Sequence, residues 1–449
     1  MACKICKWVI CRLDRLFRRL VKGKAHPLSF WGNNRPQTGK GVELSFKIPF
    51  FSRHIAPFKI ASRQSGYIRM AFGPHVALLS ARGAFFVFGV KVKRTVDLGV
   101  LYSSSGTYAA ISQAVLRGTL AGVEEINADP SNPIRFQPIV RDPKGQLERY
   151  APLCAEILES SKARHVFGCV TSSSRKEVIP TLDRTNAMLW YNLPFEGFET
   201  SNRVIYNHAC ANQHLLPLLS WCFGNFGTMP YLIGSNYIWG WETCRVARMR
   251  VEDAGGQVLG ERYLPLGEED VATLIAEIES LRPRFILNSL VGASSYAFLR
   301  AYADLGRRDP HFRPEQCPVV SCNLTEAELP LLGDAAEGLV SVGPHFCASQ
   351  SEGGRDSSFE NISRQSVHTL AAMLVAQGEQ PFESFIAEQG DLFGIDPATH
   401  HSTLEVDVAQ VRDGVFKVLH HWSDVAPDPY LTRPARHPRI DRPRLSVVS

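Results

Sequence analysis

The sequence lacks any uncharged apolar run of about 18 residues, the length that a membrane-spanning helix requires. It also lacks a secretory signal near its start, because the arginines from Arg12 to Arg19 interrupt every apolar stretch there. The motifs G-x-S-x-G, H-E-x-x-H, G-x-G-x-x-G and the Walker phosphate loop are all missing. These absences predict a cytoplasmic protein that is not an enzyme and has no cofactor.

Regular cysteine and histidine spacing is missing as well. The 11 cysteines follow no repeating interval, so they do not indicate a disulfide framework, and scattered thiols fit a reducing compartment. Cys3 and Cys6 lack a second pair, which argues against zinc. The pairs His400–His401 and His420–His421 have no helical partner four residues away, and we expect them at the surface. No metal site is therefore predicted.

Acidic residues are nearly absent from the first part of the chain. Residues 1–94 contain 19 Lys and Arg but only Asp14 and Glu43, a net charge of +17, whereas the remainder carries −12. Three explanations stay open for residues 1–93: a wrongly assigned start, a disordered basic tail, or a tether for membrane surfaces or nucleic acid. Within this extension, Cys6 to Val21 could form a basic amphipathic helix.

From Val96 onward, short apolar segments alternate with segments of helical periodicity, which predicts a parallel sheet with helices on both faces. The pattern restarts near Tyr231, so we expect an α/β protein with two lobes. The expected strands are 96–102, 134–140, 165–170, 187–191, 231–234, 257–264, 284–288, 318–321 and 339–342, followed by a hairpin of 402–406 and 415–421. The expected helices are 111–126, 147–158, 173–185, 240–254, 270–281, 292–305 and 359–377.

Ligands of open α/β sheets bind beyond the carboxyl ends of the strands. Hydroxyl groups, glycines and aromatic rings dominate these positions, and such groups enclose a small polar ligand. The candidates by this rule are Ser105, Ser172, Tyr191, Tyr237, Trp239 and Gly292. Two alternatives remain: the 171–174 hydroxyls could only cap a helix, and Tyr237 and Trp239 could be core aromatics.

Several stretches together resemble type I periplasmic-binding-protein domains of the branched-chain amino acid, urea and amide group, in particular the amide-sensing negative regulators of amidase expression. The resemblance covers about Thr95 to Tyr430. It is carried by Gly168-Cys169 with Ser172 and Arg175-Lys176, by 194–199 (P-F-E-G-F-E), by 234–238 (G-S-N-Y-I), by Val291-Gly292 and by Asp428-Pro429-Tyr430.

The resemblance implies two lobes, each a doubly wound sheet, joined by crossover strands. We expect lobe 1 at 94–208 plus about 336–380, lobe 2 at 209–335 plus about 381–435, and a tail at 436–449. Pro194 would join Ser172 and Tyr191 in the ligand site. Val170 and Leu193 stand where the amide sensors carry Tyr and Thr, so the ligand can differ from acetamide. The stretch 348–358 also looks shortened, with a first-lobe helix missing.

Two functions follow from the resemblance. The first is an amide or urea sensor that controls amidase-type genes through an RNA-binding antiterminator protein. The alternative is the solute-binding subunit of an ABC importer for short amides, urea or amino acids, which would work with a permease in the periplasm if the assigned start is wrong. In neither case does the core bind nucleic acid directly, and a homodimer is conceivable.

Overall fold

The computed structural model of the protein describes residues 59–64, 67–72, 75–80, 83–87, 93–197, 199–347 and 357–432. The chain divides into two compact units, Met1–Val92 and Lys93–Ser449. The expected helix at Cys6 to Val21, the tail at 436–449 and most of the shortened stretch at 348–358 lie outside the described residues. No helix in the described ranges is long and apolar enough to cross a membrane.

The first unit contains four strands, β1 (Lys59–Gln64), β2 (Tyr67–Phe72), β3 (His75–Ser80) and β4 (Gly83–Val87). Each pairs antiparallel with the next, so they form a simple meander. The sequence analysis predicted no strand there, because five or six residues are too few to show a clear period.

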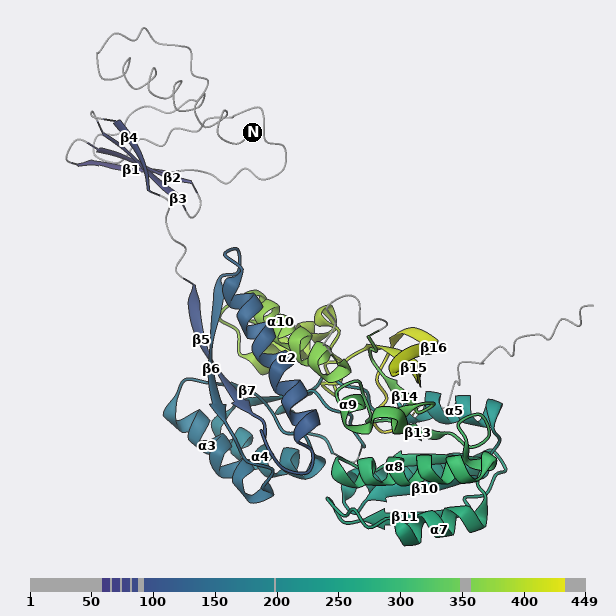
Figure 1. The fold of residues 1–449 in the computed structure, drawn as a ribbon. Helices are drawn as coiled ribbons and strands as arrows, with labels where there is room; N and C mark the ends of the chain where they lie inside the picture. Colours follow the sequence, from purple (N-terminus) through teal and green to yellow (C-terminus); the bar gives the residue numbers. More distant parts are fainter. Residues whose placement is uncertain are drawn as a thin grey trace, which may run out of the picture. The chain divides into compact units, whose positions relative to one another are not determined.

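The second unit contains two sheets. The first is fully parallel, in the order β6-β5-β7-β8-β9. Its strands are β5 (Arg94–Leu101), β6 (Ile134–Arg141), β7 (His165–Gly168), β8 (Met188–Tyr191) and β9 (Val204–Tyr206). Its helices are α2 (Ala109–Ala128), α3 (Tyr150–Ser160), α4 (Ser172–Thr185) and α10 (Ser358–Ala376), and Figure 1 shows α2 and α10 side by side.

The second sheet has the order β11-β10-β12-β13-β14-β15-β16, parallel up to β14 and antiparallel beyond it. Its strands are β10 (Pro230–Ser235), β11 (Gly260–Leu264), β12 (Phe285–Ser289), β13 (Val319–Ser321), β14 (Val340–Gly343), β15 (Leu404–Arg412) and β16 (Val415–Val425). Around it lie α5 (Leu215–Asn225), α6 (Ile238–Asp253), α7 (Ala272–Leu281), α8 (Ala293–Arg308) and α9 (Leu329–Leu332), while α11 (Phe382–Gln389) follows α10.

Burial and close packing explain the residue types found in these strands and helices. The strands β7, β8, β10 and β12 are buried at every residue and are mostly apolar in sequence, as parallel strands covered on both faces are. Helices α2 and α10 approach closely at Gly118, where a Cβ atom would lie 2.1 Å from the carbonyl oxygen of Glu360. Any side chain at this position would force the two helices apart.

The predicted fold class, a two-lobed α/β protein with mostly parallel sheets, is confirmed. Four elements of the second unit were missed: β9 has only three residues, α5 is apolar almost throughout and so lacks a helical period, α9 has only four residues, and α11 is short.

The lobe boundaries also differ from the expected ones. Residues 336–380 were assigned to lobe 1, but β14 (Val340–Gly343) pairs within the second sheet. Residues 381–403 were assigned to lobe 2, but Phe382 packs on His165, and His401 bridges Tyr206 of the first sheet. The chain therefore crosses between the sheets at different points than the sequence analysis expected.

Candidate functional site

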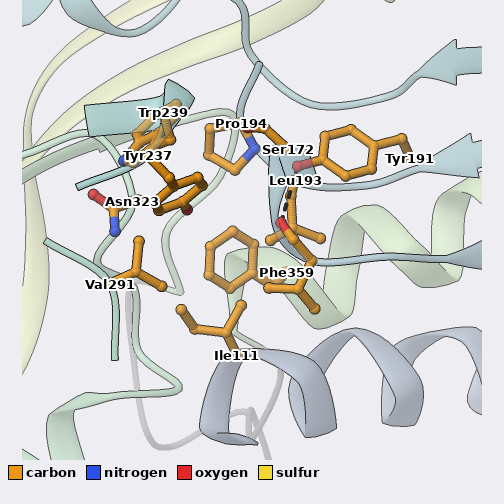
Figure 2. A pocket seen from close by; sticks show the side chains of 11 residues that line it. Ile111, Ser172, Tyr191, Leu193, Pro194, Tyr237, Trp239, Val291, Asn323 and Phe359 are labelled. Carbon is orange, nitrogen blue, oxygen red and sulfur yellow. Dashed lines mark hydrogen bonds between the residues drawn. The ribbon is translucent and has the colours of Figure 1, made fainter. Parts of the chain in front are cut away.

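A cavity lies between the two sheets of the second unit, lined by side chains from both (Figure 2). Its volume is about 30 Å³, measured for the centre of a water-sized sphere. One water needs about 10–15 Å³ on that measure, so the cavity has room for two or three water-sized groups. The lining residues are Ile111, Val170, Ser172, Tyr191, Leu193, Pro194, Tyr237, Trp239, Val291, Asn323 and Phe359.

Seven of the nine predicted ligand-site residues line this cavity, and Ser105 and Gly292 do not. Ser105 is exposed in the loop after β5. Gly292 has φ +66°, and a Cβ atom there would lie 2.0 Å from the carbonyl oxygen of Thr107. Gly292 thus permits a close backbone contact between the lobes: the Ala293 N–H donates to the Thr107 carbonyl at 3.2 Å.

At the start of α4, the hydroxyl groups that cap the helix are different from the hydroxyl-bearing residue that lines the cavity. Thr171 is the N-cap, and its Oγ1 accepts from the Ser174 N–H at 3.1 Å in a capping box. Ser172 is the first helical residue, and its hydroxyl has no hydrogen-bond partner among the described residues. The capping interpretation therefore applies to Thr171 and Ser174, and Ser172 presents its hydroxyl to the cavity.

Tyr191 contributes a fixed ring to the first-lobe wall. Its hydroxyl donates to the Val170 carbonyl oxygen at 2.9 Å, which joins the ends of β8 and β7. The proton of this hydroxyl is therefore engaged, and only the oxygen lone pairs remain for a ligand.

Behind the first-lobe wall lies an ion-pair network that the sequence analysis did not predict. The fully buried Arg175 donates to Glu196 Oε1 at 2.8 Å and to Glu199 Oε1 at 2.9 Å, and its guanidinium lies 4.6 Å from the Tyr191 ring centroid. Lys176 also contacts Glu199, at 2.9 Å. Burial would raise the pKa of Glu199, but Arg175 and Lys176 hold it below its usual value. This network connects α4, which carries Ser172, to the segment after β8.

The network also explains why separate stretches of sequence carry the family resemblance. The hydroxyl of Tyr430 donates to the Glu199 carbonyl oxygen at 3.1 Å, so the C-terminal segment reaches the same cluster. Arg175-Lys176, the 194–199 segment and Asp428-Pro429-Tyr430 are thus neighbours in space.

The second-lobe wall comes from the start of α6. Tyr237 is its N-cap residue, Trp239 lies in its first turn, and burial raises the pKa of the Tyr237 hydroxyl far above its usual value. Trp239 is 4% exposed, and its indole Nε1–H has no partner among the described residues. Tyr237 and Trp239 therefore line the cavity, as predicted, although both also pack against the core.

Four lining residues were missed: Ile111, Val291, Asn323 and Phe359. Asn323 follows β13 at its carboxyl end, so the strand-end rule would have found it had it been applied there. Val291 is adjacent to the predicted Gly292. Ile111 and Phe359 carry no signal, because apolar residues near a helix start normally belong to the core.

The histidine prediction is partly wrong. His401 is fully buried and stacks on Tyr206 at 4.2 Å between ring centroids, and burial lowers its pKa to about 3. His421, by contrast, is partly exposed and contacts Asp407 at 2.8 Å. Among the residues that the structure describes, no three His, Cys, Asp or Glu side chains group as metal ligands would.

The cavity is equipped for binding. Its polar side chains are Ser172, Tyr191, Tyr237 and Asn323, and none of the described lining residues carries a charge. The side-chain amide of Asn323 already donates to the Leu290 carbonyl at 3.0 Å. Such a lining can enclose and hydrogen-bond a small molecule, whereas hydrolysis would need a nucleophile beside a base.

Comparison with solved structures finds a similar fold in solute-binding proteins of ABC transporters. A Rhodopseudomonas palustris protein in complex with 4-hydroxybenzoate is 20% identical, with 75% of this chain and 98% of that chain covered and a TM-score of 0.62. An amino acid transporter protein from Pseudomonas fluorescens is 16% identical, with coverage of 75% and 98% and a TM-score of 0.62. A branched-chain amino acid transporter protein from Streptococcus pneumoniae, in complex with isoleucine, is 15% identical, with coverage of 74% and 100% and a TM-score of 0.61.

A family model decides the assignment. The model of the periplasmic binding protein domain matches residues 96–368, which is more than half of the chain. This agrees with the prediction of a binding protein and not of an enzyme, but it does not support the cytoplasmic location. The chain belongs to the periplasmic binding protein domain family.

Proposed function

We propose that the protein is a solute-binding protein whose two lobes enclose a small uncharged molecule. The observation that carries this proposal is the cavity between the lobes, which combines four polar side chains with an apolar lining and has no charged lining residue. A ligand with both hydrogen-bonding and apolar groups matches these walls.

The size of the cavity limits the ligand in this lobe arrangement. A sphere of 30 Å³ is about 4 Å across, so only a few bonded heavy atoms can place their centres in it. An amide or urea of acetamide size meets this limit. A benzoate or isoleucine, the ligands of two structural neighbours, would require the lobes to move apart.

The groups that line the cavity also limit the charge of the ligand. A carboxylate would find N–H groups at the buried start of α4, since helix N-termini bind anions. An amino acid would also need an acceptor for its ammonium group, and no lining residue is acidic. These contacts favour the amide or urea class over amino acids.

For the biological role, we favour the solute-binding subunit of an ABC importer, with a membrane permease as partner and the periplasm as location. The family assignment and the solute-binding proteins among the structural neighbours support this role.

The second candidate is an amide sensor that regulates amidase-type expression through an RNA-binding antiterminator. Two observations favour it: the cavity matches the size of a small amide, and seven buried cysteines of the described residues are free thiols, as in a reducing compartment.

Calorimetry with acetamide, urea, isoleucine and benzoate tests the ligand class. We expect acetamide or urea to bind, and Ser172→Ala to weaken that binding. Ser105→Ala is the matched control, because Ser105 is exposed and does not line the cavity. Binding of isoleucine alone, or equal effects of the two variants, would contradict the proposal.

Fractionation of native cells tests the role. We expect the protein in the periplasm and a permease among the proteins that purify with it. Recovery from the cytoplasm together with an RNA-binding protein would instead establish the sensor.

A further inference from the structure

One carboxylate contacts both Cys347, which follows β14 in the second lobe, and Ser358, which begins α10 on the first lobe. Glu326 follows β13, and its Oε1 accepts from the Cys347 N–H at 2.7 Å while its Oε2 accepts from the Ser358 N–H at 3.0 Å. Ser358 is the first residue of α10, which packs on α2 of the first lobe. The Glu326 side chain therefore bridges the two lobes.

Both ends of this bridge are anchored. On the second-lobe side, Glu328 accepts from the Thr325 N–H at 3.0 Å and from the Tyr296 hydroxyl at 3.2 Å, which fixes the loop that carries Glu326. On the first-lobe side, α10 lies against α2 at Gly118 without room for a side chain. A change in the distance between the lobes must therefore lengthen or break the bridge.

The bridge lies beside the cavity. Asn323 precedes Glu326 by three residues, Phe359 follows Ser358 directly, and both Asn323 and Phe359 line the cavity (Figure 2). The geometry of the bridge thus sets the separation of two cavity walls. A carboxylate at a helix N-terminus makes strong, charge-assisted hydrogen bonds, which suits this task.

We propose that Glu326 is a positioning residue that holds the lobes closed around the ligand cavity. It need not touch the ligand, because it acts through Ser358 and the start of α10. If a ligand binds only the closed arrangement, its apparent affinity falls in proportion to the closed fraction. This inference rests on the proposed ligand-binding function, but lobe closure can be measured without any ligand.

Hydrogen exchange provides that measurement, because a second hydrogen bond joins the lobes elsewhere. The Ala293 N–H donates to the carbonyl of Thr107, which lies between β5 and α2 of the first lobe. In Glu326→Ala, lobe opening should accelerate exchange at Ala293 as well as at Cys347 and Ser358. Exchange at Leu232, inside β10, should stay unchanged because it requires unfolding of the sheet.

The expected acceleration is about two- to tenfold per hydrogen bond lost. Glu326→Gln keeps one acceptor oxygen and should give an intermediate effect. Glu315→Gln is the control, because it neutralises an exposed carboxylate on the same lobe. Acceleration confined to Cys347 and Ser358 would show a local loop contact and overturn the proposal, as would equal acceleration at Leu232.

Acetamide binding supplies the functional half of the test. We expect Glu326→Ala to weaken acetamide binding by about two- to tenfold and Glu315→Gln to leave it unchanged. If the unaltered protein does not bind acetamide, the proposed ligand class fails, while the exchange at Ala293 still decides the role of Glu326. Unchanged acetamide affinity in Glu326→Ala, despite binding by the unaltered protein, would overturn the proposal.

Discussion

The two walls of the cavity differ in the buried ionisable groups that lie behind them. Behind the first-lobe wall, the charges of Arg175, Glu196 and Glu199 are buried and paired. Behind the second-lobe wall, near Asn323, lies the fully buried Glu328, whose pKa burial raises to about 8. This carboxyl group is therefore mostly protonated at pH 7, so one lobe has paired charges where the other has a buried acid that is mainly neutral.

This difference predicts how substitutions and a change of pH should affect the stability of each wall. A buried ion pair tolerates no loss of one partner, because the remaining charge has no compensation. A buried neutral carboxyl group tolerates replacement by an amide of the same shape, but it makes the wall sensitive to pH. The predictions below test this contrast from the largest expected effect to the smallest.

Arg175→Ala should cause the largest loss, about 3–5 kcal/mol in the free energy of unfolding, because it leaves the buried Glu196 without its cation and Glu199 with Lys176 alone. Urea unfolding measures this loss. The control is Arg282→Ala, which breaks an ion pair between a half-exposed arginine and Asp309 and should cost at most about 1 kcal/mol. Equal losses in both variants would mean that the buried ion pairs contribute no more to stability than the half-exposed pair does.

A neutral replacement sharpens this test. Arg175→Met combined with Glu196→Gln and Glu199→Gln removes the three buried charges from the pair network and leaves only the partly exposed Lys176. It should recover much of the stability lost in Arg175→Ala, since replacing a whole buried ion pair is often tolerated. No recovery would argue for a packing role of the guanidinium over Tyr191.

Glu328→Gln should change the pH dependence of stability. The folded state binds the Glu328 proton more tightly than the unfolded chain does, so stability is retained below pH 4.5 and lost as pH rises toward 8. The slope is at most about 1.4 kcal/mol per pH unit. Urea unfolding at several pH values should show a flatter profile for Glu328→Gln than for Glu315→Gln, and identical profiles would rule out a protonated Glu328.

Ser172→Ala and Tyr237→Phe each remove one hydroxyl from opposite walls. Each should weaken binding of an uncharged ligand by about 0.5–1.5 kcal/mol without changing the free energy of unfolding. Calorimetry with acetamide measures the loss. A deficit in only one variant would show that the ligand contacts a single lobe through hydroxyl groups.

Removal of residues 1–92 should have the smallest effect. The cavity and both sheets lie within Lys93–Ser449, so a chain starting at Lys93 should bind acetamide and unfold as the full chain does. Thermal unfolding and calorimetry on the two forms test this. Failure of the shorter chain to fold would give the basic extension a structural role.

Much of the fold was predictable because buried parallel strands and amphipathic helices leave strong periodic signals. The strand-end rule also located part of the cavity, since Ser172 and Tyr237 lie a few residues after β7 and β10 and line it. The rule failed for Ser105, which is exposed and does not line the cavity, and it gave no indication of Phe359, which reaches the cavity from a helix distant in sequence.

The sequence by itself determined that two α/β lobes follow a basic extension and that hydroxyls and aromatics gather at the strand ends. Only the tertiary structure decided which of these groups meet, which of Thr171 and Ser172 caps the helix, and that Arg175, Glu199 and Tyr430 form one cluster. The physical reason is that periodicity records burial along one element. The pairing of charges and the bridge made by Glu326 depend on segments that are brought together only when both lobes have folded.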